Sequence, residues 1–261
     1  MKLDDFCYFH RGTVTALLPA KEAGLLEPIK KEGNPQERVL LLLHGFSSSP
    51  AVYRHMLPML SMYDNILCPV LPGHGESIEA LSKVTAQDWV DCAMRHCETL
   101  LQTYSTVDVM GLSLGGLLAY HLSHHFPLNH LYLLAPALYL HLNVPLMLRL
   151  ARVLHAFGLR RIRNHAGNLR SKTFSELAYR HVPIHTSIQI LKLIQQVRFT
   201  LPTCPVDLFL GRYDEVVDNF KVAQLFQNAP QARIHWLENS AHILPLDGDV
   251  DAIIQCMTEH F

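Results

Sequence analysis

A serine flanked by glycines is the residue of this chain best suited to covalent chemistry. The segment Gly111-Leu112-Ser113-Leu114-Gly115 follows a β-type run, Val107–Met110, and leads into a helix-type run. In this G-x-S-x-G pattern a sharp strand-to-helix turn lifts the serine hydroxyl clear of the backbone, where it can act as a nucleophile. The glycines lack a Cβ, which allows the turn to tighten and the helix to pack closely on the strand. Roughly one chain in ten of this length carries the pattern by chance. The pattern therefore predicts a nucleophile only if the neighbouring strand, the helix and the rest of the sequence agree with it.

A serine hydroxyl needs a base to take its proton, usually an imidazole that a carboxylate orients. In this type of site the acid and then the histidine follow the serine along the chain, each at the carboxyl end of a later strand. Asp214 comes shortly after the strand-type run Val206–Leu210, and His242 comes shortly after the run Ala232–Leu237. Their order and their positions favour both as partners of the serine.

Each of these two residues also has a structural interpretation. Asp214 taken alone could be a solvated turn residue, and His242 a satisfied surface histidine. Glu215, Asp207 and Asp218 are rival acids, although Asp207 lies inside a strand-type run and Asp218 is expected to open the next helix. Three residues in the required order and at strand ends favour the catalytic interpretation.

Acyl transfer also needs two backbone N–H groups that stabilise a negative oxygen in the transition state. One comes from the residue after the nucleophile, Leu114, and the other from the loop after an earlier strand. The apolar run Val39–Leu43 ends at His44-Gly45-Phe46, so the Phe46 amide is the second candidate, with an ordinary turn as the alternative. Leu114 also begins a helix, whose positive end favours negative charge there.

The elements that must carry these residues alternate between strand-type and helix-type runs, after a hairpin at 6–10 and 13–18 and a connector at 19–37. Alternation of this kind predicts a mostly parallel sheet with helices on both faces. The strand-type runs are 39–43, 65–70, 107–110, 130–134, 206–210 and 232–237, and the helix-type runs are 51–63, 85–102, 114–125, 218–228 and 249–260.

The alternation stops after Ala135-Pro136. Residues 137–200 have helical periodicity and no clear strand, which predicts a helical lid inserted into a core of residues 1–136 and 201–261. This segment contains ten Arg or Lys and a single acid, Glu176, so its net charge is +9 while the rest of the chain is −10. Its apolar stripe can cover the active site while its arginines pair with the acidic core. Alternatively, it is a basic amphipathic surface that docks on anionic lipid or recognises an acidic substrate group.

Composition narrows the class of protein. With 261 residues, 49% apolar and 17% charged, the chain fits one large α/β domain, and its net charge of −1 gives no field that attracts nucleic acid. No uncharged apolar run approaches twenty residues, so a membrane-spanning helix is not expected. The six cysteines have no C-x-x-C spacing and indicate buried free thiols in a reducing cytoplasm. The seventeen histidines form no recognised metal-ligand motif.

Five segments together resemble the α/β-hydrolase fold and, more narrowly, the small bacterial carboxylesterase and monoacylglycerol lipase family. They are 40–49 (LLLLHGFSSS), 72–77 (PGHGES), 111–116 (GLSLGG), 212–217 (RYDEVV) and 240–247 (SAHILPLD). The resemblance implies an eight-stranded, mostly parallel sheet, a catalytic triad of Ser113, Asp214 and His242, and oxyanion amides at Phe46 and Leu114. It also implies no metal and no organic cofactor. Residues 137–200 do not match in sequence, and in such enzymes this segment shapes the acyl and alcohol pockets.

The expected activity is therefore hydrolysis of a small-molecule carboxylic ester through an acyl-enzyme on Ser113. A monoacylglycerol or a short-to-medium-chain ester is the working hypothesis for the substrate. Thioesterases, C–C hydrolases, peptidases and acyltransferases use the same triad and stay open, as does a non-catalytic ligand-binding protein of this fold. Serine at the turn excludes the dehalogenases and epoxide hydrolases of the fold, which carry an aspartate there. The sequence leaves the oligomeric state, lid motion and acyl-chain length undetermined.

Overall fold

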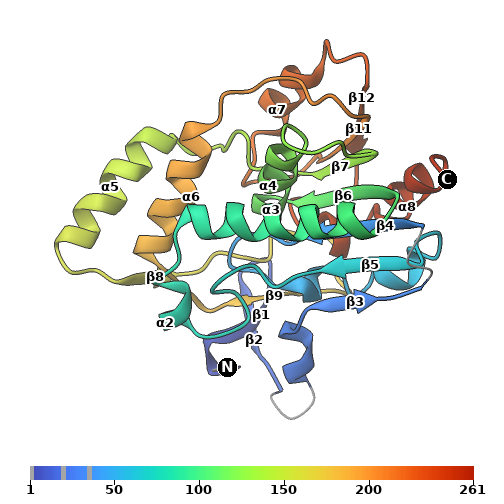
Figure 1. The fold of residues 1–261 in the computed structure, drawn as a ribbon. Helices are drawn as coiled ribbons and strands as arrows, with labels where there is room; N and C mark the ends of the chain where they lie inside the picture. Colours follow the sequence, from blue (N-terminus) through green and yellow to red (C-terminus); the bar gives the residue numbers. More distant parts are fainter. Residues whose placement is uncertain (1–2, 19–21, 34–36) are drawn as a thin grey trace.

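A twisted sheet of seven strands runs through the centre of the molecule in the order β12-β11-β7-β6-β4-β5-β3 (Figure 1). The computed structural model describes residues 3–18, 22–33 and 37–261. Neighbouring strands are parallel except β3 and β5, which are antiparallel. The strands are β3 (Ile29–Lys31), β4 (Arg38–Leu43), β5 (Asn65–Cys68), β6 (Thr106–Leu112), β7 (His130–Leu134), β11 (Val206–Gly211) and β12 (Ala232–Leu237).

Side chains that alternate along each central strand build a separate core on each face of the sheet. On β4, Leu41 and Leu43 pack with one group of helices, whereas Leu40 and Leu42 pack on the opposite face. This follows from the two-residue period of a strand, and it explains why the run is apolar at every position. The helices on the first face are α3 (Ala86–Thr103), α4 (Leu114–Leu122) and α7 (Asn219–Phe226), and α8 (Val250–Thr258) lies on the other.

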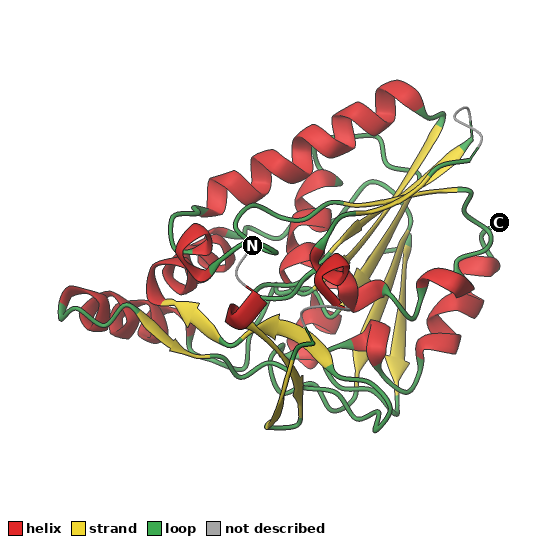
Figure 2. Ribbon diagram, turned by 90° about the horizontal axis from the view of Figure 1, so that it is seen from below, coloured by secondary structure: helices red, strands yellow, loops and turns green. Residues whose placement is uncertain are grey.

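The structure confirms a mostly parallel central sheet, and it corrects three details: the number of strands, the connector at 19–37 and the helix expected over 51–63. Among the described residues the sheet has seven strands and not eight. The hairpin β1 (Phe6–His10) and β2 (Thr13–Ala16) pairs instead with β9 (Glu176–Tyr179) in a separate sheet (Figure 2). The expected connector contains β3, whose two lysines at a sheet edge give no apolar pattern; its residues 19–21 and 34–36 lie outside the described residues.

The third correction concerns the helix expected over 51–63. The chain there forms two short 3-10 helices, η3 (Pro50–Tyr53) and η4 (Leu57–Met59). Pro58 has no N–H to donate and its ring clashes with the preceding turn, so a continuous α-helix cannot form. The helix α3, by contrast, begins as predicted: the Thr85 side chain accepts from the Asp88 backbone, and Asp88 accepts in return. Further short elements are η1 (Leu3–Asp5), η2 (Ala23–Leu26), α2 (Ile78–Leu81) and η5 (Leu244–Leu246).

Residues 137–200 contain strands as well as helices, which corrects the expectation of a helical segment without strands. The helices α5 (Val144–Ala156) and α6 (Ile184–Gln196) lie side by side, away from the sheet (Figure 1), and share a small apolar core. Between them, β8 (Arg161–Arg163) pairs with β10 (His181–Pro183), and β9 pairs with the hairpin. These strands could not be predicted from the sequence, because runs of three or four residues are too short to show a period and because the hairpin that pairs with β9 lies far away along the chain. Among the described residues, none of the helices has both the length and the apolar character that crossing a membrane requires.

The turn between β6 and α4 depends on close backbone contacts. A Cβ on Gly111 would lie 2.1 Å from the Gly115 carbonyl oxygen, and one on Gly115 would lie 1.9 Å from that of Leu43. Real Cβ atoms essentially never come closer than 3.0 Å to such atoms. The two glycines therefore let the start of α4 pack directly against β4 and its own strand.

We expect Gly115→Ala to lower the free energy of unfolding by about 2–3 kcal/mol, because the added methyl group must displace the β4 backbone. This loss outweighs the gain of about 1 kcal/mol that alanine brings as a better helix former. Urea unfolding measures it. Gly24→Ala is the control, since a Cβ there meets nothing within 4 Å, and its effect should stay below about 0.5 kcal/mol. Equal stability of the two variants would contradict the close approach of α4 to β4.

Candidate active site

Ser113 occupies the turn between β6 and α4 in a backbone conformation that side-chain-bearing residues rarely adopt. Its φ is +55° and its ψ is −111°. Three hydrogen bonds hold this residue: its N–H donates to Leu134 O at 3.0 Å, and its carbonyl accepts from the N–H groups of Leu117 (2.9 Å) and Ala137 (3.0 Å). Strain of this kind persists only where the surrounding structure fixes it. Here Leu134 at the end of β7, Ala137 shortly after it and Leu117 of α4 fix the backbone of Ser113.

The structure brings His242 and Asp214 together, as the sequence predicts. The Nδ1 of His242 lies 2.8 Å from Asp214 Oδ2. The other carboxylate oxygen accepts the backbone N–H groups of Val216 (2.8 Å) and Val217 (2.9 Å), so the loop itself orients the acid. Both side chains are buried, with exposed fractions of 7% and 1%. Because Nδ1 is engaged, Nε2 is the nitrogen left to act as a base.

The rival acids lie elsewhere. Asp218 caps α7 by accepting the Lys221 N–H, as expected of a helix-opening residue. Glu215 is exposed. Asp207 contacts three other histidines near the opposite end of the sheet. Asp214 is thus the acid that contacts His242.

Burial by itself lowers the pKa of His242, but the negative charge of Asp214, the hydrogen bond to it and the charge of Glu176 raise this pKa above its ordinary value. The imidazole is therefore set to hold a proton more firmly than a free histidine. This property suits a group that must carry positive charge in the middle of a reaction.

A cavity of about 350 Å³ connects Ser113 and His242 to the segment 137–200. Gly45 and Phe46 line it on one side. Apolar side chains of α5 and α6 line the other, among them Met147, Leu150, Leu154, Ile184, Leu191 and Ile194. The wall opposite the serine is therefore mostly hydrocarbon.

Both oxyanion candidates lie beside the nucleophile. Leu114 is buried at the first position of α4, directly after Ser113. Phe46 lines the cavity, and a Cβ on the adjacent Gly45 would lie only 3.6 Å from the Cβ of Ser113. The loop after β4 thus passes close to the serine, as a second oxyanion donor requires.

Two buried histidines that the sequence analysis did not single out support this loop. His44 Nε2 accepts the Leu71 N–H at 3.1 Å, and His74 Nε2 accepts the Ser47 N–H at 3.1 Å. Both rings must be neutral at these nitrogens. Accordingly, burial lowers the pKa of His44 to about 4 and that of His74, with help from the charge of His44, to about 3. Their signal in the sequence was their place in the HGF and PGHG segments.

Glu176 is a further residue whose place the sequence could not predict. It lines the cavity and is 3% exposed, and its Oε2 accepts the Gly167 N–H at 2.7 Å. Burial raises the pKa of this carboxyl. In the sequence it stood out only as the single acid of a basic segment.

The doubly covered parallel sheet, with a serine at a glycine-rich turn and a buried histidine–aspartate pair after later strands, is the architecture of the α/β hydrolases. The chain belongs to the alpha/beta hydrolase family, whose sequence profile matches residues 40–255.

Individual relatives agree with this assignment. The chain is 30% identical over 247 residues to the thermostable monoacylglycerol lipase of Bacillus sp. (strain H-257), covering 90% of this chain and 94% of that one. It is 26% identical over 238 residues to a carboxylesterase of Bacillus subtilis (strain 168), covering 85% and 92%. Among solved structures, a metagenome-derived lipolytic enzyme has a similar fold, with a TM-score of 0.80, 21% identity and coverage of 90% and 96%. The Paleococcus ferrophilus monoacylglycerol lipase does too, with a TM-score of 0.71, 16% identity and coverage of 90% and 99%.

We expect Asp214→Asn to lower the pKa of His242, because the substitution removes the largest influence that raises it. Imidazole signals followed by NMR across a pH series measure this directly and need no substrate. Glu215→Gln is the matched control: it removes an exposed charge from the neighbouring residue and should leave the His242 titration unchanged. An unchanged or raised His242 pKa in Asp214→Asn would show that the pair does not couple as described.

Proposed function

We propose that this protein hydrolyses carboxylic esters through an acyl-enzyme on Ser113. The observation that carries the proposal is the 2.8 Å contact between His242 and Asp214 at a cavity that the serine also lines. Relatives named as a monoacylglycerol lipase and a carboxylesterase support the reaction class.

In the proposed first step the Ser113 hydroxyl oxygen attacks the acyl carbon while His242 Nε2 takes its proton. Asp214 stabilises the imidazolium that results, and the Phe46 and Leu114 amides stabilise the negative oxygen. His242 then protonates the leaving alcohol, and the ester bond breaks. In the second step a water molecule gives its proton to His242 and attacks the acyl-enzyme, which releases the acid and restores the serine.

We propose an aliphatic acyl ester as the substrate, with a monoacylglycerol or a short-to-medium-chain ester as the specific candidates. The apolar wall that α5 and α6 provide supports a hydrocarbon chain there. Thioesters and other acyl donors that react through the same triad are the alternatives, and a set of leaving groups on one acyl chain distinguishes them.

A series of p-nitrophenyl esters from acetate to palmitate tests the reaction, with monoacylglycerols as the natural counterpart. We expect turnover with the shorter and medium chains, and a fall in kcat on the order of 10⁶-fold in Ser113→Ala, because the nucleophile is lost. Fluorophosphonate labelling of the wild type, absent in Ser113→Ala, checks the reactivity of the serine separately. Labelling without turnover would favour a binding protein, and turnover that survives Ser113→Ala would refute the proposed nucleophile.

We further propose that residues 137–200 act as a lid on a core of residues 1–136 and 201–261, and that the lid docks on anionic lipid. On α5 and just after it, Leu146, Val153 and Phe157 are 60%, 51% and 86% exposed. Arg149 and Arg152 lie on the same helix. An apolar helix face with basic neighbours is complementary to an anionic membrane surface. Since Leu150 of the same helix lines the cavity, docking would bring the active site to its substrate.

Vesicle sedimentation with equal parts of phosphatidylglycerol and phosphatidylcholine tests the docking. We expect binding to weaken as salt rises from about 0.1 M to about 1 M, where screening shortens to about 3 Å. Leu146→Glu should weaken binding by about tenfold or more, because a buried leucine contributes about 2 kcal/mol. Leu18→Glu is the control, since Leu18 is also 60% exposed but lies outside the lid. Salt-independent binding, equal loss in both variants, or self-association through α5 instead would overturn the docking.

We also propose a reducing compartment such as the cytoplasm. All six cysteines are buried and none is joined to another, which supports this assignment.

A further inference from the structure

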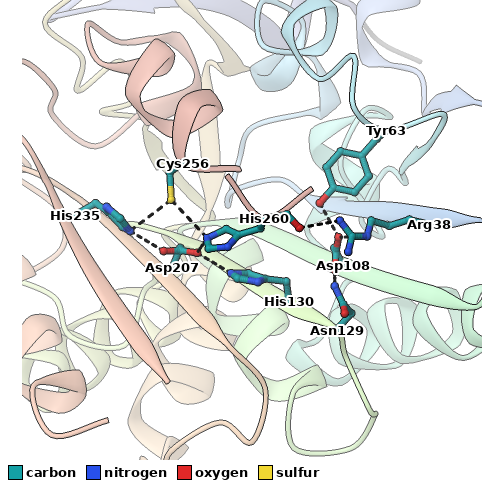
Figure 3. A network of polar contacts seen from close by, with 9 residues as sticks. All are labelled: Arg38, Tyr63, Asp108, Asn129, His130, Asp207, His235, Cys256 and His260. Atoms are coloured by element: carbon teal, nitrogen blue, oxygen red, sulfur yellow. Dashed lines mark hydrogen bonds and ion pairs between the residues drawn. The ribbon is translucent and has the colours of Figure 1, made fainter. Parts of the chain in front are cut away.

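A second cluster of titratable side chains lies around Asp207 (Figure 3), near the amino ends of β7 and β11 and so at the opposite end of these strands from Asp214. His130 begins β7, and Asp207 is the second residue of β11. The strand β11 carries Asp207 and is followed by Asp214, seven residues on; β12 carries His235 and is followed by His242, also seven residues on. The cavity beside Ser113 and the cavity beside Asp207 share none of their described lining residues. The second cluster is therefore outside the active site.

Three imidazoles converge on one buried carboxylate. The Nε2 atoms of His130 and His260 lie 2.6 Å and 2.8 Å from Asp207 Oδ2, and the Nε2 of His235 lies 2.6 Å from Oδ1. The Sγ of Cys256, a residue of α8, lies 3.5 Å from His235 Nε2 and 4.0 Å from His260 Nε2. The Asp207 side chain is 1% exposed. Five potential metal ligands thus lie around Asp207, in two groups of three that share its carboxylate.

Each imidazole can donate one hydrogen bond to Asp207, whereas the Cys256 sulfur has only longer contacts, of 3.5 Å and 4.0 Å, to two of the imidazole nitrogens. Each Nε2 has either one hydrogen or one lone pair, yet His235 Nε2 and His260 Nε2 each face both a carboxylate oxygen and the Cys256 sulfur. One N–H cannot point at two acceptors in different directions with good geometry. A single cation between the nitrogen, oxygen and sulfur atoms would replace the two long sulfur contacts with metal–ligand bonds.

The donor set and its dimensions fit a borderline transition metal. Imidazole, carboxylate and thiolate are the ligands of zinc, with bonds of about 2.0–2.3 Å, so tetrahedral neighbours lie roughly 3.3–3.7 Å apart. The Cys256–His235 separation matches this range. All donor atoms within each of two groups, His130–Asp207–His260 and Asp207–His235–Cys256, lie within 4.8 Å of one another. The carboxylate–imidazole pairs would have to open by roughly 0.5–1 Å, a small change for side-chain torsions.

The surroundings offer an entry path and hold the ligands in place. A cavity of about 390 Å³ is lined by His130, Asp207 and His260, through which an ion can enter. The His235 ring stacks on Phe209, and His130 stacks on Tyr132. Arg38 contacts the His260 backbone oxygen at 3.3 Å and so fixes the chain end.

The neighbouring carboxylate does not compete for the ion. Asp108 Oδ2 accepts from the Tyr63 hydroxyl at 2.6 Å, and Oδ1 accepts from Asn129 at 2.7 Å (Figure 3). Arg38 lies 3.5 Å from Oδ2. Asp108 is therefore occupied by donors, whereas Asp207 faces imidazoles and a thiol.

We propose that Asp207, His235 and Cys256 bind a divalent transition metal of the zinc type, that His260 moves in as the fourth ligand, and that His130 stays hydrogen-bonded to Asp207 Oδ2. Binding releases the thiol proton to solvent as the metal–sulfur bond forms. The site joins α8 and the chain end to β11 and β12. The ion stabilises the fold and takes no part in ester hydrolysis, so this inference is independent of the proposed function.

Titration of the chelator-treated, reduced full-length protein with Co²⁺ and then Zn²⁺ tests the site. We expect one ion per chain, the visible absorption of tetrahedral cobalt with a thiolate charge-transfer band, and displacement of cobalt by zinc. At a free Zn²⁺ concentration of about 100 times the Kd the melting temperature should rise by roughly 5–10 °C. Lack of saturable one-to-one binding in the wild type, or a cobalt spectrum without the thiolate band, would overturn the proposal.

Two ligand variants with matched controls locate the ion. His260→Gln and Cys256→Ser should each weaken Zn²⁺ binding by about 100-fold or more, while ester hydrolysis at low temperature stays unchanged. His125→Gln removes a histidine from outside the cluster, and Cys92→Ser a buried cysteine from outside it; both should bind Zn²⁺ as the wild type does. Equal affinity in ligand and control variants would overturn the site. If a ligand variant does not fold, the thiolate band in the wild-type cobalt spectrum still tests whether a cysteine binds the ion.

Discussion

The contact between the start of α4 and the backbones of β4 and β6 is the constraint on which the position of Ser113 depends. Only glycine at 111 and 115 permits it, since a Cβ at either position would lie within about 2 Å of a carbonyl group. The same turn forces Ser113 to a φ of +55°, which costs about 1–3 kcal/mol. Hydrogen bonds to Leu134, Leu117 and Ala137 hold the serine there. The loops after β11 and β12 bring Asp214 and His242 together at the same edge of the sheet as Ser113, because these parallel strands end there.

Electrostatics within the site follow from burial and from which groups are paired. His44 and His74 have no carboxylate partner, so burial keeps them neutral and they serve as acceptors for the loop that carries Phe46. His242 is buried as well, yet Asp214 and Glu176 reverse the effect of burial on its pKa. Buried histidines thus differ in pKa within one site: the pKa is lowered at His44 and His74, and it is raised at His242 because carboxylates lie nearby.

The segment 137–200 connects parts of the chain that are distant in sequence. Its strand β9 pairs with the N-terminal hairpin, its helices α5 and α6 form the apolar wall of the cavity, and its Glu176 acts on His242. A change in this segment can therefore alter both the shape of the pocket and the basicity of the histidine. The amino edge of the sheet, by contrast, gathers Asp207 and its three histidines and is independent of this segment.

The sequence by itself determined what depends on local signals. Strand-type runs marked β7 and β12 with their observed bounds, and glycines marked the turn at Ser113. The position of Asp214 just after a strand-type run selected it over Asp207, which lies inside that run, and over Asp218, which opens the next helix. Tertiary structure alone decided the features whose partners lie far along the chain. β9 is a strand because the hairpin pairs with it, and Glu176 is buried because the fold closes around it. His130, His235, Cys256 and His260 gather around Asp207 only because β7, β11 and β12 lie side by side and α8 packs against them. No periodicity or short spacing in the sequence records such contacts, since their energy comes from groups that only folding brings together.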